Sequence, residues 1–154
     1  MAFRFNLEQI LKYRDGLEDQ AQEKLAKKKQ ELKKADGRLQ NLRTEQENMR
    51  GVCRQQVSQK QSIDVVSLSY TYQYINRLGE RIEDQAKEKS KCQAKVNRQR
   101  EEVKKCWQEK RVMEILKDKM YNQYLEEEKK VEQSVLDELS LQGFIRNKNG
   151  SPNL

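Results

Sequence analysis

The 154-residue sequence contains no histidine, one proline, six glycines and three cysteines, and only 6% of its residues are aromatic. Without histidine, neither a Ser–His nor a Cys–His nucleophile pair can form. Cys53, Cys92 and Cys106 are an odd set without CxxC spacing, which argues against a disulfide framework or a zinc site and favours a reducing compartment. The sequence also lacks a glycine-rich phosphate loop followed by GK[ST]. We therefore expect a protein that is not an enzyme and that binds no cofactor or metal.

Apolar residues are also scarce, at 34% of the chain against 37% charged residues. This is too little apolar material for a compact globular core. High charge with low hydrophobicity is typical of disordered chains, but the scarcity of proline and glycine argues against disorder, and the preferred residues are strong helix formers. No apolar run approaches the roughly 18 residues of a membrane span, and the N-terminus carries charge where a signal peptide needs an apolar stretch. We expect long helices in a soluble, cytoplasmic protein.

The apolar residues recur at alternating spacings of three and four, as in a coiled coil. One such seam runs from Leu7 to Cys53, and a second runs from Ile75 to Met113 before it shifts phase and continues from Leu116 to Val135. Several seam positions hold polar residues, which lower the stability of a coiled coil while fixing its register. These positions are Lys28, Gln46, Gln85, Lys89, Gln99 and Lys110.

The heptad pattern breaks between residues 58 and 69, where serines and β-branched residues replace it. The sequence therefore predicts an all-α fold, a long antiparallel two-helix coiled-coil hairpin in a single domain over residues 1–142. We expect helix one at about 4–60, the turn at about 61–68 and helix two at about 69–142, followed by a disordered tail over 143–154. Either Ser67 or Ser69 is expected to cap the second helix, and Gly143 to end it. A turn near residue 65 pairs positions whose numbers add up to about 130, so the second helix extends past the first from about residue 127.

Charge is distributed unevenly along the chain. Residues 1–125 carry 28 basic and 19 acidic side chains, a net charge of +9, whereas residues 126–154 carry 4 basic and 6 acidic side chains, a net charge of −2. A basic body suits an acidic partner, a nucleic acid or an anionic membrane surface. Because both signs are interspersed, the face of a solvated coiled coil is the simpler interpretation.

Two aromatic groups exceed what the seam requires. Tyr70, Tyr72 and Tyr74 follow the predicted turn, where they form either an apolar plug that closes the hairpin or a docking surface. Phe3 and Phe5 stand at the start of the chain. They either staple the end of the first helix onto the second or belong to a motif.

The N-terminal string favours the motif. Phe3-Arg4-Phe5, followed by Leu7-Glu8, Ile10-Leu11 and Arg14, resembles the start of the flagellar export protein family FliJ. Four further segments are similar to that family over roughly residues 3–142, and they lie along the predicted second helix. They are Tyr74-Ile75 with Leu78, Trp107 with Glu109-Lys110-Arg111, Glu132-Gln133, and Asp137-Glu138.

This resemblance implies a non-catalytic component of the flagellar type III export apparatus, cytoplasmic and peripherally associated with the inner face of the cell membrane. Proteins of this family insert into the hexameric export ATPase FliI, promote its assembly and contact the export gate protein FlhA and export chaperones. The resemblance implies neither a nucleic acid nor a small-molecule substrate as a partner.

The resemblance also implies two sets of site residues. The expected ATPase-binding residues are Phe5, Leu7, Leu11 and Arg14. The expected export-gate-binding residues near the hairpin turn are Leu42, Met49, Tyr74 and Leu78. Glu45 departs from the pattern at the second of these sites, because an apolar or aromatic side chain would suit that surface better.

Three other functions stay open at the level of sequence. The same rod would serve as the stalk of a virulence-type secretion system, with a different partner. A nucleic-acid-binding coiled coil would use the basic body, although only Trp107 beside Lys110 and Arg111 resembles a stacking platform. A generic hairpin chaperone is the third.

Overall fold

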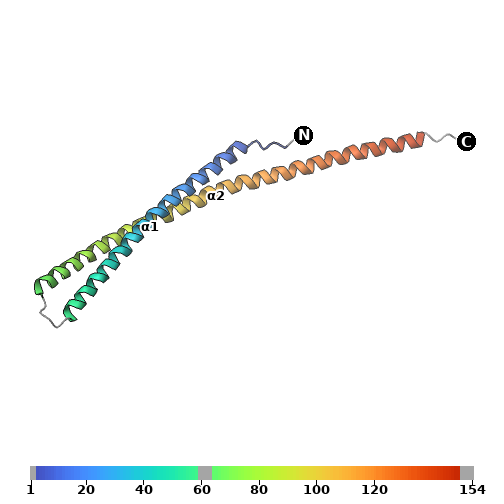
Figure 1. Ribbon diagram of the computed structural model, residues 1–154. Coiled ribbons are helices and arrows are strands. Elements are labelled where there is room, and N and C mark those ends of the chain that lie inside the picture. Colours follow the sequence, from blue (N-terminus) through green and yellow to red (C-terminus); the bar gives the residue numbers. More distant parts are fainter. Residues whose placement is uncertain (1–2, 59–63, 150–154) are drawn as a thin grey trace. The chain divides into compact units, whose positions relative to one another are not determined.

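The computed structural model describes residues 3–58 and 64–149 and contains two helices in that part of the chain, α1 (Glu8–Ser58) and α2 (Val65–Asn149). The described residues form no strand. The predicted all-α helical hairpin is therefore confirmed (Figure 1). Neither helix contains an apolar stretch long enough to cross a membrane within these described ranges.

The chain divides into two compact units, which we describe separately. The hairpin unit comprises the described residues between Gly16 and Trp107, and the terminal unit comprises those up to Asp15 together with those from Gln108 onward. Both helices contribute to both units, because α1 and α2 each continue across the boundary in sequence.

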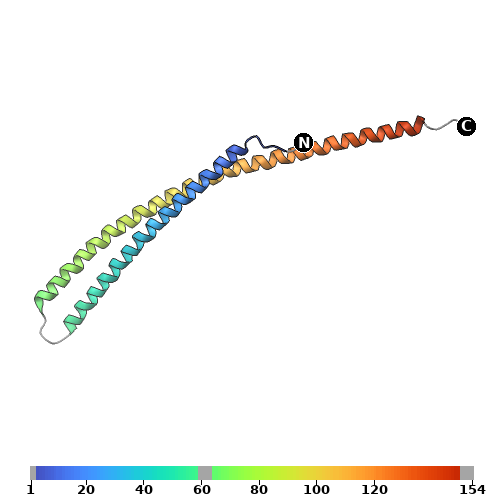
Figure 2. The same ribbon diagram turned by 45° about the horizontal axis from the view of Figure 1, so that its top comes forward.

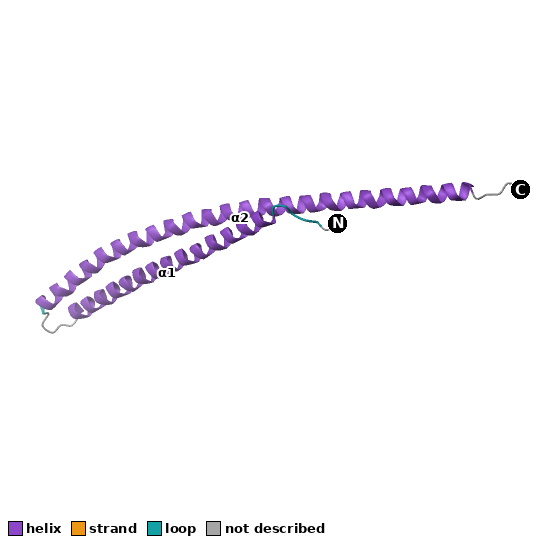
Figure 3. Ribbon diagram, turned by 90° about the horizontal axis from the view of Figure 1, so that it is seen from above, coloured by secondary structure: helices purple, strands orange, loops and turns teal. Residues whose placement is uncertain are grey.

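In the hairpin unit, α1 and α2 run side by side in opposite directions (Figures 2 and 3). Their seam is narrow and buries small and aliphatic side chains. The most deeply buried are Leu78 and Val96, both 0% exposed, and Leu39, 2% exposed. The other buried apolar residues of this unit are Ala21, Ala35, Cys53, Ile75 and Cys92.

Three seam glutamines connect the two helices of the hairpin unit. Gln85 donates its side-chain amide to the main-chain carbonyl of Ala35 at 3.2 Å, and Gln99 donates to the carbonyl of Ala21 at 3.4 Å. Gln46 does the same from α1, at 3.3 Å from the Ile75 carbonyl oxygen. Opposite two of the glutamines the side chain is only a methyl group, so the amide reaches the backbone. The polar seam residues thus link the helices at fixed positions.

The structure corrects the predicted turn. α2 begins at Val65, four residues earlier than expected, because Asp64 caps it in place of Ser67 or Ser69. The Asp64 carboxylate accepts the main-chain N–H of Val66 at 3.1 Å, and the Asp64 carbonyl accepts that of Leu68 at 3.0 Å. A short acceptor just before the first turn satisfies amides that have no partner within the helix. The first part of the predicted turn, up to residue 63, lies outside the described residues.

The register shifts with the turn. In each unit, the residues joined across the helices by hydrogen bonds or ion pairs have numbers that add up to between 119 and 125, not about 130. The midpoint between Ser58 and Val65 lies near residue 61, so a residue of α1 faces one of α2 that comes several positions earlier than expected. In the terminal unit, Glu8 therefore pairs with Lys117.

The helix boundaries at the two ends of the chain also differ from the prediction. α1 starts at Glu8 rather than near residue 4, because residues 3–7 turn to place the two Phe rings against α2. α2 continues through Gly143 to Asn149, where we expected a tail, and no described glycine has a positive φ. A glycine ends a helix when it adopts the left-handed conformation, which Gly143 does not. The last five residues lie outside the described part.

Candidate functional site

The terminal unit holds the first candidate site, where the N-terminal segment is fixed to α2 by aromatic and charged contacts. The Phe3 ring meets Tyr121 edge-on at 5.2 Å between centroids and Tyr124 at 5.7 Å. Phe5 is buried, and the Lys117 Nζ lies 5.9 Å from the centroid of its ring. Lys117 also pairs with Glu8 at 2.7 Å.

The four predicted ATPase-binding residues lie together in this unit but mostly face inward. Phe5 is 6% exposed, and Leu7, Leu11 and Arg14 are half-buried. Arg14 donates to the carboxylate of Glu109 on α2. These residues therefore hold the N-terminal segment in place. Phe5 also lines a groove of about 570 Å³, together with Phe3, Arg4, Asn6, Glu8 and Gln9.

Two apolar side chains next to these residues are exposed. Ile10 is 44% exposed and Tyr13 is 64% exposed, and residues three apart on a helix lie on the same face. Sequence reasoning did not select this pair, because it took the site residues from the family resemblance. One signal in the sequence could have identified Ile10 and Tyr13: both are apolar or aromatic residues outside the heptad seam, in a chain that has few such residues.

The hairpin unit holds the second candidate site, near the start of α2. Met49 and Tyr74, two of the predicted gate-binding residues, line the same groove of about 480 Å³. The rest of its lining comes mainly from the first turns of α2, including Val66 and Tyr70, which are 62% and 68% exposed. The three tyrosines after the turn are all more than a third exposed, so an apolar plug does not describe them.

The other two predicted gate-binding residues are placed differently. Leu42 is half-buried, and Leu78 is completely buried in the helix–helix seam. Neither lines the groove. Leu78 supports this face from within and is closed to a partner while the hairpin stays packed.

Glu45, which departs from the expected pattern, has a specific contact in the structure. The Tyr74 hydroxyl donates a hydrogen bond to its carboxylate. This hydrogen bond raises the pKa of Tyr74 above its ordinary value, and the nearby negative charge acts in the same direction. In the terminal unit, Glu128 raises the pKa of Tyr124 in the same way.

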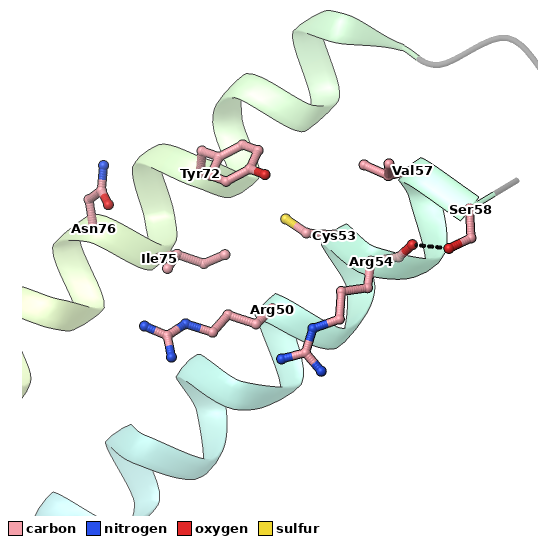
Figure 4. Close-up of a pocket in the computed structure, with 8 residues that line it drawn as sticks. All are labelled: Arg50, Cys53, Arg54, Val57, Ser58, Tyr72, Ile75 and Asn76. Atoms are coloured by element: carbon pink, nitrogen blue, oxygen red, sulfur yellow. Dashed lines mark hydrogen bonds between the residues drawn. The ribbon is translucent and has the colours of Figure 1, made fainter.

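A further groove of about 580 Å³ lies between the two helices at the same end of the hairpin unit (Figure 4). Tyr72 and Ile75 line it from α2, and Cys53 and Val57 from α1. Arg50 and Arg54 lie along its edge, and both pair with Glu47, at 3.8 Å and 2.8 Å. Because Glu47 offsets part of this positive charge, the groove is not a strong anion site.

Among the described residues, no group of three or more cysteine, aspartate or glutamate side chains is arranged to hold a metal ion. The three cysteines are free thiols, and Cys53 and Cys92 are buried. Exposed apolar side chains occur in both candidate sites, at Ile10 and Tyr13 in the terminal unit and at Val66 and Tyr70 in the hairpin unit.

Comparison with protein families gives one match. The sequence matches the family model described as Flagellar FliJ protein over residues 3–149, which is nearly the whole chain. No curated protein and no solved structure matches it.

Proposed function

The chain belongs to the flagellar FliJ protein family, which acts in flagellar protein export, and on that basis we propose that it is the non-catalytic stalk of the flagellar export ATPase. In this role it inserts into the hexameric ATPase FliI, promotes its assembly and connects it to the export gate protein FlhA. The observation that carries the proposal is the family match over residues 3–149. The two long helices that pack side by side in the hairpin unit support it.

We assign ATPase binding to the terminal unit. The exposed Ile10 and Tyr13 provide apolar contact area, and tyrosine is enriched in interface cores. Phe5, Leu7, Leu11 and Arg14 act beneath them by fixing the segment to α2. The ion pairs of Arg14 with Glu109 and of Glu8 with Lys117 hold this surface in one conformation before it binds, which lowers the entropy lost on association.

Gate binding is assigned to the groove of the hairpin unit. Met49 and Tyr74 line this groove, and the exposed Val66 and Tyr70 extend it. Methionine and tyrosine provide adaptable apolar contacts. Leu42 lies on the same helix as Met49, two turns before it, and Leu78 supports the face from the seam. Export chaperones are further proposed partners of the chain.

Co-purification with the export ATPase, followed by electron microscopy of the ATPase ring, tests the proposal. We expect helical density in the central channel of the ring only when the chain is present. A ring with an empty channel at saturating chain concentration would contradict it.

A further inference from the structure

The last turns of α2 carry an apolar surface that nothing in the described chain covers. Five of the seven exposed large apolar side chains between residues 131 and 145 lie on one broad side of the helix, within an arc of about 160° at 3.6 residues per turn. They are Val131, Val135, Leu139, Leu141 and Ile145, each at least 50% exposed. The side-chain hydrogen bonds of this stretch, from Gln133 to Asp137 and from Ser140 to the Leu136 carbonyl, stay within α2.

We propose that this surface pairs with the same surface of a second copy of the chain, in antiparallel orientation, with the twofold axis at Ser140. In this register, facing residues have numbers that add up to about 280. Val135 then faces Ile145 of the second copy, while Leu139 and Leu141, which lie on opposite edges of the surface, each lie beside their own counterparts close to the axis. Each of these contacts is apolar, and Glu138 and Gln142 face each other as a polar pair in the same seam.

The charges beside this seam support the same register. Glu132 and Arg146 flank the apolar side chains on one edge of the surface, and neither has an ion-pair partner among the described residues. In the antiparallel pairing centred on Ser140, Glu132 of each copy faces Arg146 of the other. The dimer therefore contains two contacts between opposite charges. A parallel pairing would instead place each charge opposite itself, which is unfavourable.

A second copy fits this surface better than an unrelated occupant does, because one symmetry axis satisfies both the apolar and the charged positions. A twofold interface must be complementary to itself, and this surface meets that condition in the register described. The surface is short, so we expect a weak dimer in concentration-dependent exchange with the monomer. The inference does not depend on the proposed function, because it concerns the isolated chain.

Sedimentation velocity of the full chain, under reducing conditions and over a wide concentration range, tests this pairing. We expect self-association that Leu139→Glu weakens at least tenfold, because it places two carboxylates next to each other beside the twofold axis. Phe144→Glu is the matched control. It changes a comparably exposed apolar residue (68% against 58%) that lies outside the arc of the surface, about 140° around the helix from Leu139, and we expect it to leave association unchanged.

Charge exchange tests the register. Glu132→Arg and Arg146→Glu are each expected to weaken self-association about tenfold, since two attractive contacts become two repulsive ones. An equimolar mixture of the two variants restores association. In the mixed dimer, the arginine introduced in one variant faces the glutamate introduced in the other, and the unaltered Glu132 and Arg146 face each other at the second contact.

Three results would overturn the inference. The first is a chain that is monomeric at all concentrations. If the Leu139→Glu variant of such a chain also fails to stimulate the ATPase, the surface belongs to the ATPase interface. The second is equal weakening by Phe144→Glu. The third is a mixture of the charge variants that associates no better than each variant alone.

Discussion

Tyr74 of α2 donates its phenolic hydrogen to Glu45 of α1, across the helix pair at the groove assigned to gate binding. This contact gives the unexpected glutamate a role, because it fixes the orientation of an exposed ring. Glu45, which departs from the expected pattern, thus positions Tyr74, which fits the pattern.

The pairing predicts an altered titration. Glu45 raises the pKa of Tyr74, so the hydrogen bond is intact below the ordinary tyrosine pKa of about 10 and is lost as the pH rises through the higher folded value. The phenolate absorbance that disappears in Tyr74→Phe should therefore titrate above pH ~10. In a Glu45→Gln background, it should return toward the ordinary value. Tyr124→Phe is the control, because Tyr124 titrates beside Glu128 in the other unit. An unchanged midpoint in Glu45→Gln would contradict the pairing.

The seam glutamines predict a gain in stability on substitution. Gln85→Leu should raise the free energy of unfolding by about 1 kcal/mol, because the gain from burying an aliphatic side chain in a half-buried seam exceeds one neutral hydrogen bond. Chemical denaturation measures the change. Gln30→Leu, at an exposed position of the same unit, should change it by less than about 0.5 kcal/mol. A loss of stability in Gln85→Leu would show that the hydrogen bond to Ala35 is the stronger term.

The cap predicts a local effect. Asp64→Ala removes the acceptor of the Val66 amide and should cost about 1 kcal/mol at the start of α2. Hydrogen exchange of that amide should then be about five times faster. Ser69→Ala, at one of the two positions that the sequence analysis favoured as the cap, should leave it unchanged. Faster exchange in Ser69→Ala than in Asp64→Ala would instead support Ser69 as the cap.

Phe5 predicts the cost of releasing the N-terminal segment. Phe5→Ala removes a buried ring and its contact with Lys117, and it should destabilise the terminal unit by about 3 kcal/mol. Limited tryptic digestion after Arg14 should become faster, because the ion pair of Arg14 with Glu109 then forms only part of the time. Ile10→Ala, at an exposed position, should digest at the rate of the unaltered chain. Equal rates for the two variants would show that Phe5 does not hold the segment.

Sequence reasoning predicted the two-helix hairpin because the heptad spacing from Leu7 to Cys53 and from Ile75 onward depends only on helix geometry. It also placed Gln46, Gln85 and Gln99 in the seam, where they lie. The position of the turn was harder to predict from the sequence, because Asp64, Ser67 and Ser69 are all good N-cap residues. Only the folded structure shows which of them caps α2. The predicted pairing of α1 with α2 was derived from the position of the turn, so it was wrong by the corresponding number of residues.

The candidate sites were predicted only in outline. Heptad positions point into the seam, so residues chosen by their similarity to a family motif include supporting ones such as Leu78, which is fully buried. Ile10 and Tyr13 were identified only once the structure showed which face of α1 is exposed to solvent. Gly143 was expected to end α2, but a glycine within a helix costs only about 1 kcal/mol relative to alanine and need not stop it.

The two assigned surfaces predict separable losses of binding. Tyr13→Asp and Tyr70→Asp introduce the same charge at similarly exposed tyrosines, 64% and 68%, in different units. Tyr13→Asp should weaken ATPase binding at least tenfold and leave gate binding unchanged. Tyr70→Asp should do the reverse. Titration calorimetry with each partner measures both, and parallel losses in both variants would contradict the assignment.

The most direct test of the stalk proposal measures the oligomer size and turnover rate of the export ATPase as the chain is added to saturation. The proposal predicts a shift of the ATPase toward hexamers with a higher turnover rate, with the Tyr70→Asp chain as active as the unaltered one and the Tyr13→Asp chain needing at least tenfold higher concentrations for the same effect. Unchanged oligomer size and turnover at saturation would contradict it.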